Sequence, residues 1–416
     1  MNSPLSLSLK NEKFVFRRLE DLRVTGRRVF VRADFNVPLV PSQASPTGMS
    51  VADDARIRGA LPTIQWLSDA GARVVLASHL GRPSGRDERS LSMEPVGISL
   101  SEHLRKDVVF SGECDLTQVR HLVNGLKGGG MLLLENLRYW AGEEENSPDF
   151  SRQLSLFTDV YINDAFGSVH RLHASTVGLP ALVSEKGIGR LVEQELIAFS
   201  AALSNPARPF LLIIGGAKLS DKLPVIEHLI ESVDACCIGG AMAYTFLAAQ
   251  GHRTGKSPVD RANIGLVRRV MERAERRGVA IYLPQDHVMA LDLKGEGPLE
   301  ISSAADISDD FLAFDIGPHT VEQWSNVIAE AKSIIWNGPL GVFEQERFAK
   351  GTLAIAQAVA EGNAFKIVGG GDSLAAIRKS GYESLMSHCS TGGGAMLKLL
   401  SGASLPALKV LNEAHP

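Results

Sequence analysis

Short apolar runs alternate with segments of helical periodicity along almost the whole chain. In one such segment, residues 54–68, Ile57, Leu61, Ile64 and Leu67 fall on one face of a helix. This alternation predicts an α/β fold in which two parallel sheets are each flanked by helices, in a Rossmann-like arrangement. The predicted strands lie within residues 28–36, 73–82, 131–138 and 159–167, and then within 211–218, 235–243, 280–286, 333–339 and 366–373.

The boundary between two domains is predicted near residues 187–209. Gly187 and Gly189 precede a predicted helix over residues 191–203, and the sequence NPARP then ends that helix before the next strand. This helix would join the two halves. Residues 41–50 read as a loop rich in Pro, Ser and Gly.

Composition excludes several classes of protein. The chain has 416 residues, 44% hydrophobic and 22% charged, with a net charge of −4, so neither nucleic acid nor an anionic membrane is expected as a partner. Four cysteines without a CxxC pair argue against a disulfide framework or a zinc site. No secretory signal pattern and no apolar run of about 20 residues are present, which predicts a cytoplasmic protein.

The stretch LLIIGGAKLSDK, residues 211–222, predicts a phosphate site. Its apolar run reads as a buried strand, and Gly215 and Gly216 let the backbone turn sharply beside a ligand. Lys218 and Lys222 are one helical turn apart, so their ammonium groups can face one point at the start of the next helix. The alternative is an ordinary crossover with two solvated lysines.

Basic and polar residues follow the predicted strands of the first half, and arginine forks suit phosphate or carboxylate. Because ligands collect at the carboxyl ends of parallel strands, these residues predict a site for a small polyanion. Arg56 lies in the first turn of its helix, where a cation is unfavourable unless an anion or an acidic neighbour balances it. Surface ion pairs are the alternative for each arginine. The residues are Arg32, Asp34, Asn36, His79, Arg82, Arg138, Asn163, Asp164, Arg171 and His173.

Glycines stand at the corresponding positions of the second half: 215–216, 239–240, 338 and 369–371, with 392–394 opening a further helix. Exposed backbone at several turns suits a flat base and a chain of phosphates. Asp372 follows one such turn, where a carboxylate can hold Mg²⁺ that already carries phosphate oxygens, although it and Ser373 also suit a helix N-cap. The two halves together predict a phosphoryl-transfer enzyme whose cleft closes.

Three other sequence patterns are candidates for functional motifs, and the residues support none of them. QGHRTGKS at 250–257 is like a Walker A loop, but Gln250 stands where glycine is needed and a helix precedes it. No GxGxxG is followed by a suitable acidic residue, which weakens a dehydrogenase interpretation. His170 and His173 lack acidic or cysteine partners nearby in the sequence, so a metal site there is not expected.

Nine motifs stand in order along the chain: RADFNVP (32–38), SHLGRP (78–83), ENLR (135–138), NDAFGSVHRLH (163–173), GGAKLSDK (215–222), GGAMAYTFL (239–247), WNGPLGVFE (336–344), GGGDS (369–373) and STGGGA (390–395). With these motifs the chain resembles the phosphoglycerate kinase family over nearly its whole length. The resemblance implies a cytoplasmic monomer that transfers a phosphoryl group in line between 1,3-bisphosphoglycerate and ADP, giving 3-phosphoglycerate and ATP, with Mg²⁺.

The resemblance also implies a domain plan. We expect an N-terminal phosphoglycerate-binding domain over residues 1–190, a hinge helix over 191–204 and a C-terminal nucleotide-binding domain over 205–400. The segment 401–416 is expected to pack back toward the N-terminal domain. The family's two domains close about the hinge, so the open form is expected to hold its two sites too far apart to react.

By the same resemblance, three sets of residues carry the function. The phosphoglycerate site would consist of Asp34, Phe35, Asn36, Arg56, His79, Leu80, Gly81, Arg82, Arg138 and Arg171. The nucleotide site would consist of Lys218, Lys222, Asn337, Glu344, Gly370, Gly371, Asp372 and Ser373, with Asp372 on Mg²⁺. The phosphoryl group in transfer would be stabilised by Arg56, Lys218 and the amides around Gly393.

The chain departs from the family pattern after STGGGA. Met396 and Lys398 stand where the family usually has a small polar residue and, two positions on, an acidic one, and the tail ALKVLNEAHP also differs. These differences bear on contacts of the C-terminal segment and leave the expected chemistry intact. The alternative function is a two-domain binding protein for sugar phosphates without catalysis.

Overall fold

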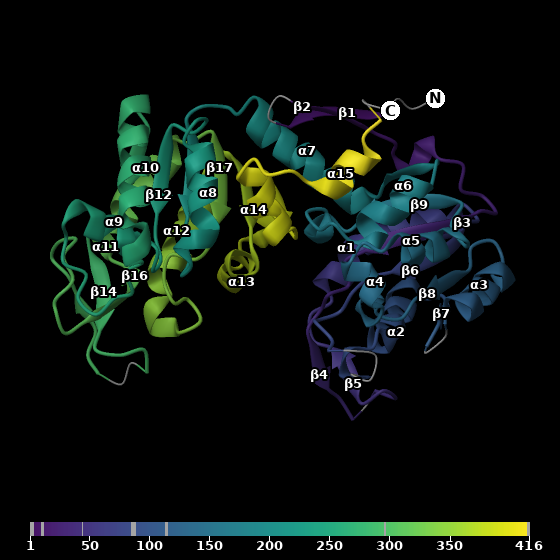
Figure 1. The fold of residues 1–416 in the computed structure, drawn as a ribbon. Helices are drawn as coiled ribbons and strands as arrows, with labels where there is room; N and C mark the ends of the chain where they lie inside the picture. Colours follow the sequence, from purple (N-terminus) through teal and green to yellow (C-terminus); the bar gives the residue numbers. More distant parts are fainter. Residues whose placement is uncertain are drawn as a thin grey trace. The chain divides into compact units, whose positions relative to one another are not determined.

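The computed structural model describes residues 4–9, 12–43, 45–84, 89–112, 115–294 and 297–413, so Cys114 lies outside the described residues. Contacts divide the chain into two compact units (Figure 1). Unit 1 comprises Met1–Ile197 and Ser404–Pro416, and unit 2 comprises Ala198–Ala403.

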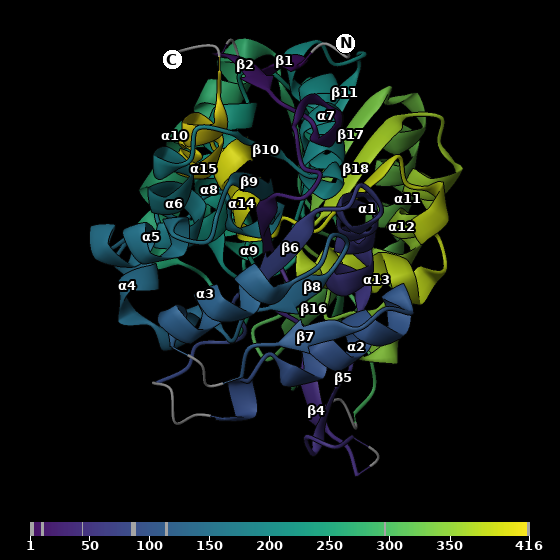
Figure 2. The same cartoon turned by 90° about the vertical axis from the view of Figure 1, so that its right-hand side faces the viewer.

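Unit 1 is built on a six-stranded sheet in which every strand is parallel to its neighbours. The order is β10 (Lys186–Ile188), β9 (Val160–Asp164), β3 (Arg28–Ala33), β6 (Arg73–Ala77), β8 (Met131–Leu133) and β7 (Val108–Phe110). Crossover connections between the parallel strands put helices on both faces of the sheet. One face carries α1 (Ala55–Asp69) and α2 (Glu94–Leu104); the other carries α3 (Leu116–Gly125), α5 (Pro148–Ser155) and α6 (Leu179–Leu182) (Figure 2).

Unit 2 repeats this plan with a second parallel sheet of six strands. The order is β13 (Ala280–Tyr282), β12 (Ala235–Ile238), β11 (Phe210–Ile214), β17 (Ser333–Asn337), β18 (Phe365–Gly369) and β19 (His388–Ser390). One face carries α8 (Leu219–Leu229), α9 (Ala243–Gln250) and α10 (Ile264–Arg277); the other carries α11 (Pro318–Glu330), α12 (Lys350–Glu361) and α13 (Gly371–Ser380) (Figure 2).

The two parallel sheets flanked by helices confirm the predicted fold class. The structure adds elements that the sequence pattern did not indicate, because they are short or lie at edges. Three are the edge strands β7, β10 and β19, each of three residues. The others are two hairpins, β1 (Leu5–Leu9) with β2 (Glu12–Phe16) and β4 (Leu39–Pro41) with β5 (Met49–Val51), the short helix α4 (Ala141–Glu144), and a small antiparallel sheet of β15 (Glu300–Ile301), β14 (His287–Ala290) and β16 (Leu312–Ile316).

Helix α7 (Arg190–Ser204) runs from unit 1 into unit 2. Its first turn is fixed by Asp164 at the end of β9, whose Oδ1 accepts hydrogen bonds from the amides of Leu191 (2.9 Å) and Val192 (3.3 Å). Gly189 precedes the helix because a Cβ there would lie 2.3 Å from the carboxyl group of Asp164. The end of a central strand therefore sets where this helix begins.

The C-terminal segment, after α14 (Gly394–Leu400), contains α15 (Pro406–Leu411) and packs against the N-terminal part of unit 1. The amide of Ala407 donates to the carbonyl of Val169 at 3.1 Å. Glu413 pairs with Arg17 at 2.6 Å, next to hairpin β1–β2. This end of the chain thus packs on both the hairpin and the loop that follows β9.

Lys366, in β18, stabilises the end of α12. Its ammonium group is buried and donates to the carbonyls of Val359 (2.9 Å), Ala360 (2.7 Å) and Gly362 (2.7 Å), which the helix leaves unpaired. We expect Lys366→Met to lower the free energy of unfolding by about 2–3 kcal/mol, measured by urea denaturation, because these charge-assisted bonds are lost. The exposed Lys332 is the control: Lys332→Met should change stability by less than about 0.5 kcal/mol. Equal effects of the two substitutions would contradict the assignment.

Candidate active site

The basic residues predicted in the first half lie where β3, β6, β8 and β9 of unit 1 end. Asp34 to Asn36 follow β3, and His79 to Arg82 follow β6. Arg138 follows β8, and Arg171 comes after β9. Since these strands are parallel neighbours, the topology brings their carboxyl ends to one edge of the sheet. We call Asp34, Arg56, His79, Arg82, Arg138 and Arg171 the basic cluster.

Backbone and side-chain bonds connect the loops that carry this cluster. Arg56, in the first turn of α1, donates from Nη1 to Oδ1 of Asp34 at 3.0 Å. The amide of Gly81 donates to Oδ1 of Asn36 at 2.9 Å, and Arg138 donates from Nη1 to the carbonyl of Gly81. A cation is unfavourable at a helix N-terminus, and here the carboxylate of Asp34, which follows β3, offsets the charge of Arg56.

Two of the predicted substrate residues serve mainly to hold the loops. Phe35 and Leu80 are both fully buried. The amide of Phe35 donates to Oγ of Ser78 at 2.8 Å, and Leu80 exchanges two hydrogen bonds with the side chain of Asn136, at 3.1 and 2.7 Å. Their side chains belong to the core, so any part they play in binding comes through the position of the loop.

The pKa shifts of His79 and Asp34 show that the charged groups of the basic cluster lie close together. Burial and the charges of Arg32, Arg138 and Arg171 lower the pKa of His79 well below its usual value, although Asp34 opposes this. Burial would raise the pKa of Asp34, but the charges of Arg56 and Arg32 and the hydrogen bond from the amide of Asn36 outweigh it and the pKa is lowered. The cluster therefore holds one carboxylate and a neutral imidazole among several guanidinium groups.

Arg171 and Arg138 retain hydrogen-bonding capacity. Nε of Arg171 is buried and has no hydrogen-bond partner among the described residues. Burial lowers the pKa of Arg138, and the neighbouring charges of Arg171, Arg32 and Arg82 add to this, while Glu144, 3.0 Å from its Nε, opposes it. A buried donor without a partner and mutually repelling arginines favour binding of an anion.

Two further residues shape this edge: Asn136, which the sequence interpretation missed, and Arg32, which it named at a strand end but did not include in the phosphoglycerate site. Asn136 holds the loop after β6 to the loop after β8, since its side chain bonds Leu80 and also the amide of Arg138 at 3.1 Å. Arg32, fully buried, contacts His79. Both stand inside conspicuous motifs, and a polar residue within an apolar strand end was the available signal.

In unit 2, the glycines at the ends of β11, β12 and β17 pack backbone against backbone. A Cβ on Gly215 would lie 2.2 Å from the carbonyl oxygen of Pro339, and one on Gly338 would lie 2.1 Å from that of Gly215. Gly240 has φ +65° and leaves only 2.5 Å between such an atom and the amide nitrogen of Gly216. These turns need glycine for their own packing, in addition to any role in binding.

Lys222 and Asn337 meet at the same edge of unit 2. Lys222 donates to Oδ1 of Asn337, whose Nδ2 donates to the carbonyl of Gly369 at 2.6 Å. Burial lowers the pKa of Lys222 to about 8, although Asp372 and Asp221 oppose this. Oγ of Ser373 accepts from the amide of Gly338 at 2.6 Å, so this hydroxyl joins the end of β17 to α13.

Helix α13 begins in a turn suited to phosphate. Gly370 has φ +100° and is its N-cap, and a Cβ on Gly371 would meet nothing within 4 Å. Asp372, exposed in the first turn, is the one predicted metal ligand. Among the described residues no group of three or more His, Cys, Asp or Glu side chains is placed to hold a metal. A single carboxylate fits Mg²⁺ that is bound mainly through nucleotide phosphates.

Three further predicted residues of unit 2 lie at exposed or half-buried positions. Lys218 is exposed at the N-cap of α8, four residues before Lys222. Glu344 is exposed in the loop after β17, and Gly393, with φ +45°, precedes α14. Lys218 therefore has its charge available, as a residue that contacts a ligand requires.

The lowered pKa of Lys222 makes the charge of this predicted nucleotide-binding side chain sensitive to pH. Below about pH 8 the ammonium group is charged; as the pH rises through 8 it loses its charge and its attraction for phosphate. We expect kcat/KM for ATP to fall between pH 7 and 9 with an apparent pKa near 8. Lys222→Arg keeps its charge over that range and should flatten the profile. An unchanged slope in the variant would exclude Lys222 as the titrating group.

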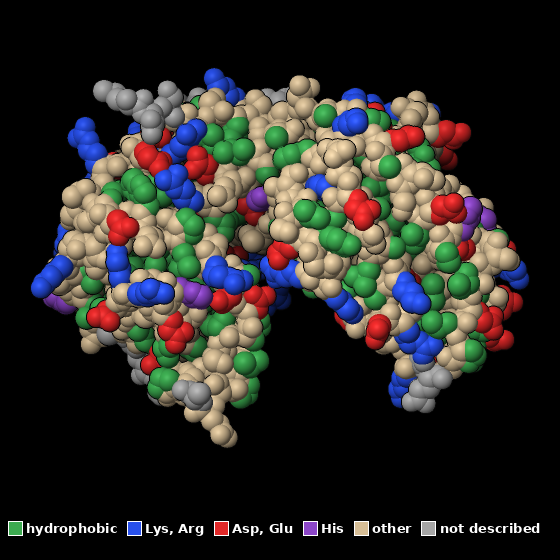
Figure 3. Space-filling view, turned by 180° about the vertical axis from the view of Figure 1, so that it is seen from behind, with side chains coloured by type: hydrophobic (Ala, Val, Ile, Leu, Met, Phe, Trp, Pro, Cys, Tyr) green, Lys and Arg blue, Asp and Glu red, His purple; other side chains and the backbone are tan. Residues whose placement is uncertain are grey.

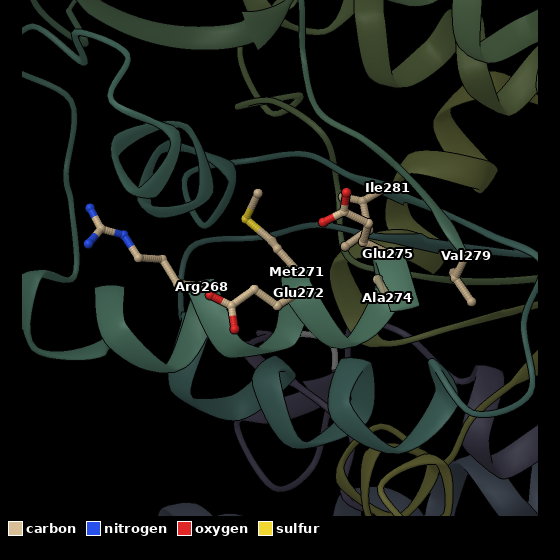
Figure 4. Close-up of a pocket in the computed structure, with 7 residues that line it drawn as sticks. All are labelled: Arg268, Met271, Glu272, Ala274, Glu275, Val279 and Ile281. Atoms are coloured by element: carbon tan, nitrogen blue, oxygen red, sulfur yellow. The ribbon is translucent and has the colours of Figure 1, made fainter. Parts of the chain in front are cut away.

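A cavity of about 370 Å³ lies elsewhere on unit 2, along α10 (Figure 4). It contains none of the predicted site residues. Its lining mixes charged and apolar side chains, from Arg268, Met271, Glu272, Ala274, Glu275, Val279 and Ile281.

On the face shown in Figure 3, basic and acidic side chains are interspersed. The basic cluster is thus a local concentration of charge.

Comparison with known proteins gives consistent matches. The model of the family described as phosphoglycerate kinase matches residues 19–403. Phosphoglycerate kinases of Anaeromyxobacter dehalogenans and Bdellovibrio bacteriovorus are 47% and 43% identical to the chain; each alignment covers 95% of it, and 99% and 97% of those proteins.

Solved structures agree with these matches. The structure of phosphoglycerate kinase from Coxiella burnetii has a TM-score of 0.85 at 37% identity, and that from Pyrococcus horikoshii 0.79 at 33%. Each comparison covers 95% of this chain and 98% of the other. Because both sheets, the strand-end motifs and nearly the full length agree, the chain belongs to the phosphoglycerate kinase family.

Proposed function

We propose that this chain catalyses the reversible transfer of a phosphoryl group between 1,3-bisphosphoglycerate and ADP, which gives 3-phosphoglycerate and ATP in glycolysis. The observation that carries the proposal is the basic cluster at the carboxyl edge of the unit 1 sheet. Its arginines lie around a neutral His79, and Arg171 offers a buried Nε–H that has no hydrogen-bond partner in the part of the chain that the structure describes. A small acid that carries a phosphate and a carboxylate matches these donors.

In unit 1, each part of the cluster has a proposed role. Arg82, Arg138 and Arg171 bind the phosphate of the three-carbon acid through their guanidinium forks. Asp34, which holds Arg56 at 3.0 Å, and Asn36 orient the rest of the substrate. In this arrangement the guanidinium group of Arg56 is held where it can contact the phosphoryl group to be transferred.

In unit 2, Lys218, Lys222 and the backbone amides of Gly370–Ser373 bind the nucleotide phosphates, with Asn337 and Glu344 as further contacts. Lys222 and Asn337 are already joined by a hydrogen bond, which fixes both side chains. Asp372 would hold Mg²⁺ together with those phosphates. When bound, the metal neutralises phosphate charge.

The transfer itself needs no covalent enzyme intermediate. The acyl phosphate and the β-phosphate of ADP react in line, and the protein supplies position and positive charge. Arg56, Lys218 and the amides around Gly393 stabilise the charge that spreads over the phosphoryl oxygens. Helix α7, which connects the two units, is the proposed hinge between an N-terminal domain (1–190) and a C-terminal domain (205–400).

A coupled assay tests the proposal by following ADP formation from ATP and 3-phosphoglycerate with and without Mg²⁺. Turnover that requires all three components is expected. Tight binding of 3-phosphoglycerate without any turnover would instead support the alternative of a binding protein.

We further propose that the enzyme is a cytoplasmic monomer. None of its described helices is long and apolar enough to cross a membrane.

A further inference from the structure

Arg32 is a fully buried arginine beside the basic cluster. It is the fifth residue of β3, and its guanidinium group has three partners. Nε donates to Oγ of Ser175 at 2.8 Å, Nη1 donates to the carbonyl of Ala33, and Nη2 lies 3.2 Å from Nδ1 of His79. All of its contacts are internal, so it has no evident need to touch a ligand itself.

The contact with His79 fixes where the imidazole carries its proton. A guanidinium group has donors and no acceptor, so Nδ1 of His79 must be the acceptor in this hydrogen bond. The proton of the neutral ring is then on Nε2. We propose that Arg32 is a positioning residue that holds His79 in its neutral Nε2–H form, so that the ring presents one oriented donor to the anionic substrate of the basic cluster. This role rests on the proposed function.

A buried carboxylate keeps Arg32 in place. Glu143, in α4, is fully buried and accepts from Ser175 twice, from the amide at 2.9 Å and from Oγ at 2.5 Å. Burial would raise the pKa of Glu143, but His173, Arg32 and Ser175 outweigh it and lower the pKa. Glu143 is therefore ionised and offsets the charge of Arg32 through the bridging hydroxyl of Ser175, which compensates the cost of burying each charge.

This network also reaches the segment that carries Arg171. Ser175 lies in a π-helical turn, Ala174–Gly178, just after that arginine. The phenol of Tyr161, in β9, donates to the carbonyl of Ser175 at 2.8 Å. Arg32 thus connects β3, the loop after β6 and the segment after β9, three of the places from which the basic cluster is assembled.

The charges that face His79 agree with a neutral ring. They come from Arg32, Arg138, Arg171 and Asp34, on β3 and on the segments after β3, β8 and β9. Burial and the three arginines lower the pKa of His79, so protonation would add a fourth cation to the same place. Over the neutral pH range the ring is then a donor without a positive charge.

Nitrogen NMR of the full chain labelled with ¹⁵N-histidine tests the proposal without substrate, so its outcome does not depend on kinase activity. The signal of His79, assigned with His79→Gln, should show an unprotonated Nδ1 and a protonated Nε2 from pH 8 to pH 5.5. A proton on Nδ1, or an imidazolium within that range, would overturn the proposal.

The variant Arg32→Lys keeps the charge but loses the fork. We expect it to produce a tautomer mixture at His79 and to raise KM for 3-phosphoglycerate about tenfold, while KM for ATP changes less than about twofold. Ser175→Ala, which removes the acceptor of Nε, should shift both readouts in the same direction and serves if Arg32→Lys does not fold. Arg73→Lys, at the opposite end of the neighbouring strand β6, is the control. An unchanged His79 signal with unchanged KM in a folded variant would refute the role of Arg32.

Discussion

Replacing Lys218 with alanine should lower kcat by about two to three orders of magnitude. Lys218 is exposed at the start of α8, in the motif GGAKLSDK, and is proposed to stabilise the phosphoryl group during transfer. A charge about 4 Å from that group contributes about 4 kcal/mol at an effective dielectric of about 20, but only about 1 kcal/mol in bulk water. Loss of the larger amount corresponds to a factor near 10³ in rate.

Steady-state kinetics with ATP and 3-phosphoglycerate measure this effect. KM for ATP should rise only a few-fold, because Lys222 and the α13 turn remain to bind the nucleotide. Lys332→Ala removes another exposed lysine of unit 2 and should leave kcat within about twofold. If Lys218→Ala retained more than a tenth of the activity, its proposed role in transfer would be wrong; if the wild type had no activity to lose, the chain would be a binding protein.

The sequence predicted those parts of the site that depend on topology. Asp34, His79 and Arg138 each follow a strand, and parallel strands of one sheet end at one edge, so their proximity follows from order alone. The glycines of unit 2 were predictable for the same reason, because turns at strand ends that approach each other require them.

The other parts of the site depend on side-chain packing, which the periodicity of the sequence does not indicate. Arg32 stands in an apolar strand, and the sequence does not say that its guanidinium turns inward to Ser175 and His79. Ser373 was open to two interpretations, and its hydroxyl in fact accepts from the amide of Gly338, 35 residues away. Edge strands such as β7 and β19 were not predicted because a run of only three residues leaves too weak a pattern.

Replacing Arg56 with alanine should also lower kcat by about two to three orders of magnitude and raise KM for 3-phosphoglycerate. Arg56 is half-buried and its Nη1 lies 3.0 Å from Oδ1 of Asp34. Its loss removes positive charge from the transferred group and also leaves Asp34 without its nearest cation. Since Arg56 is the main group that lowers the pKa of Asp34, that pKa should rise in the variant.

Arg58 offers a closely matched control, because it lies two residues further along α1 and is largely exposed. It pairs with Asp54 at 3.2 Å, an exposed ion pair of the kind that contributes little. Arg58→Ala should therefore keep kcat within about twofold, whereas Arg56→Lys, which retains charge without the fork, should recover only part of the loss. Similar rates for Arg56→Ala and Arg58→Ala would show that the start of α1 takes no part in the transfer. A loss confined to KM, with kcat unchanged, would make Arg56 a residue that binds substrate equally well before and during the transition state.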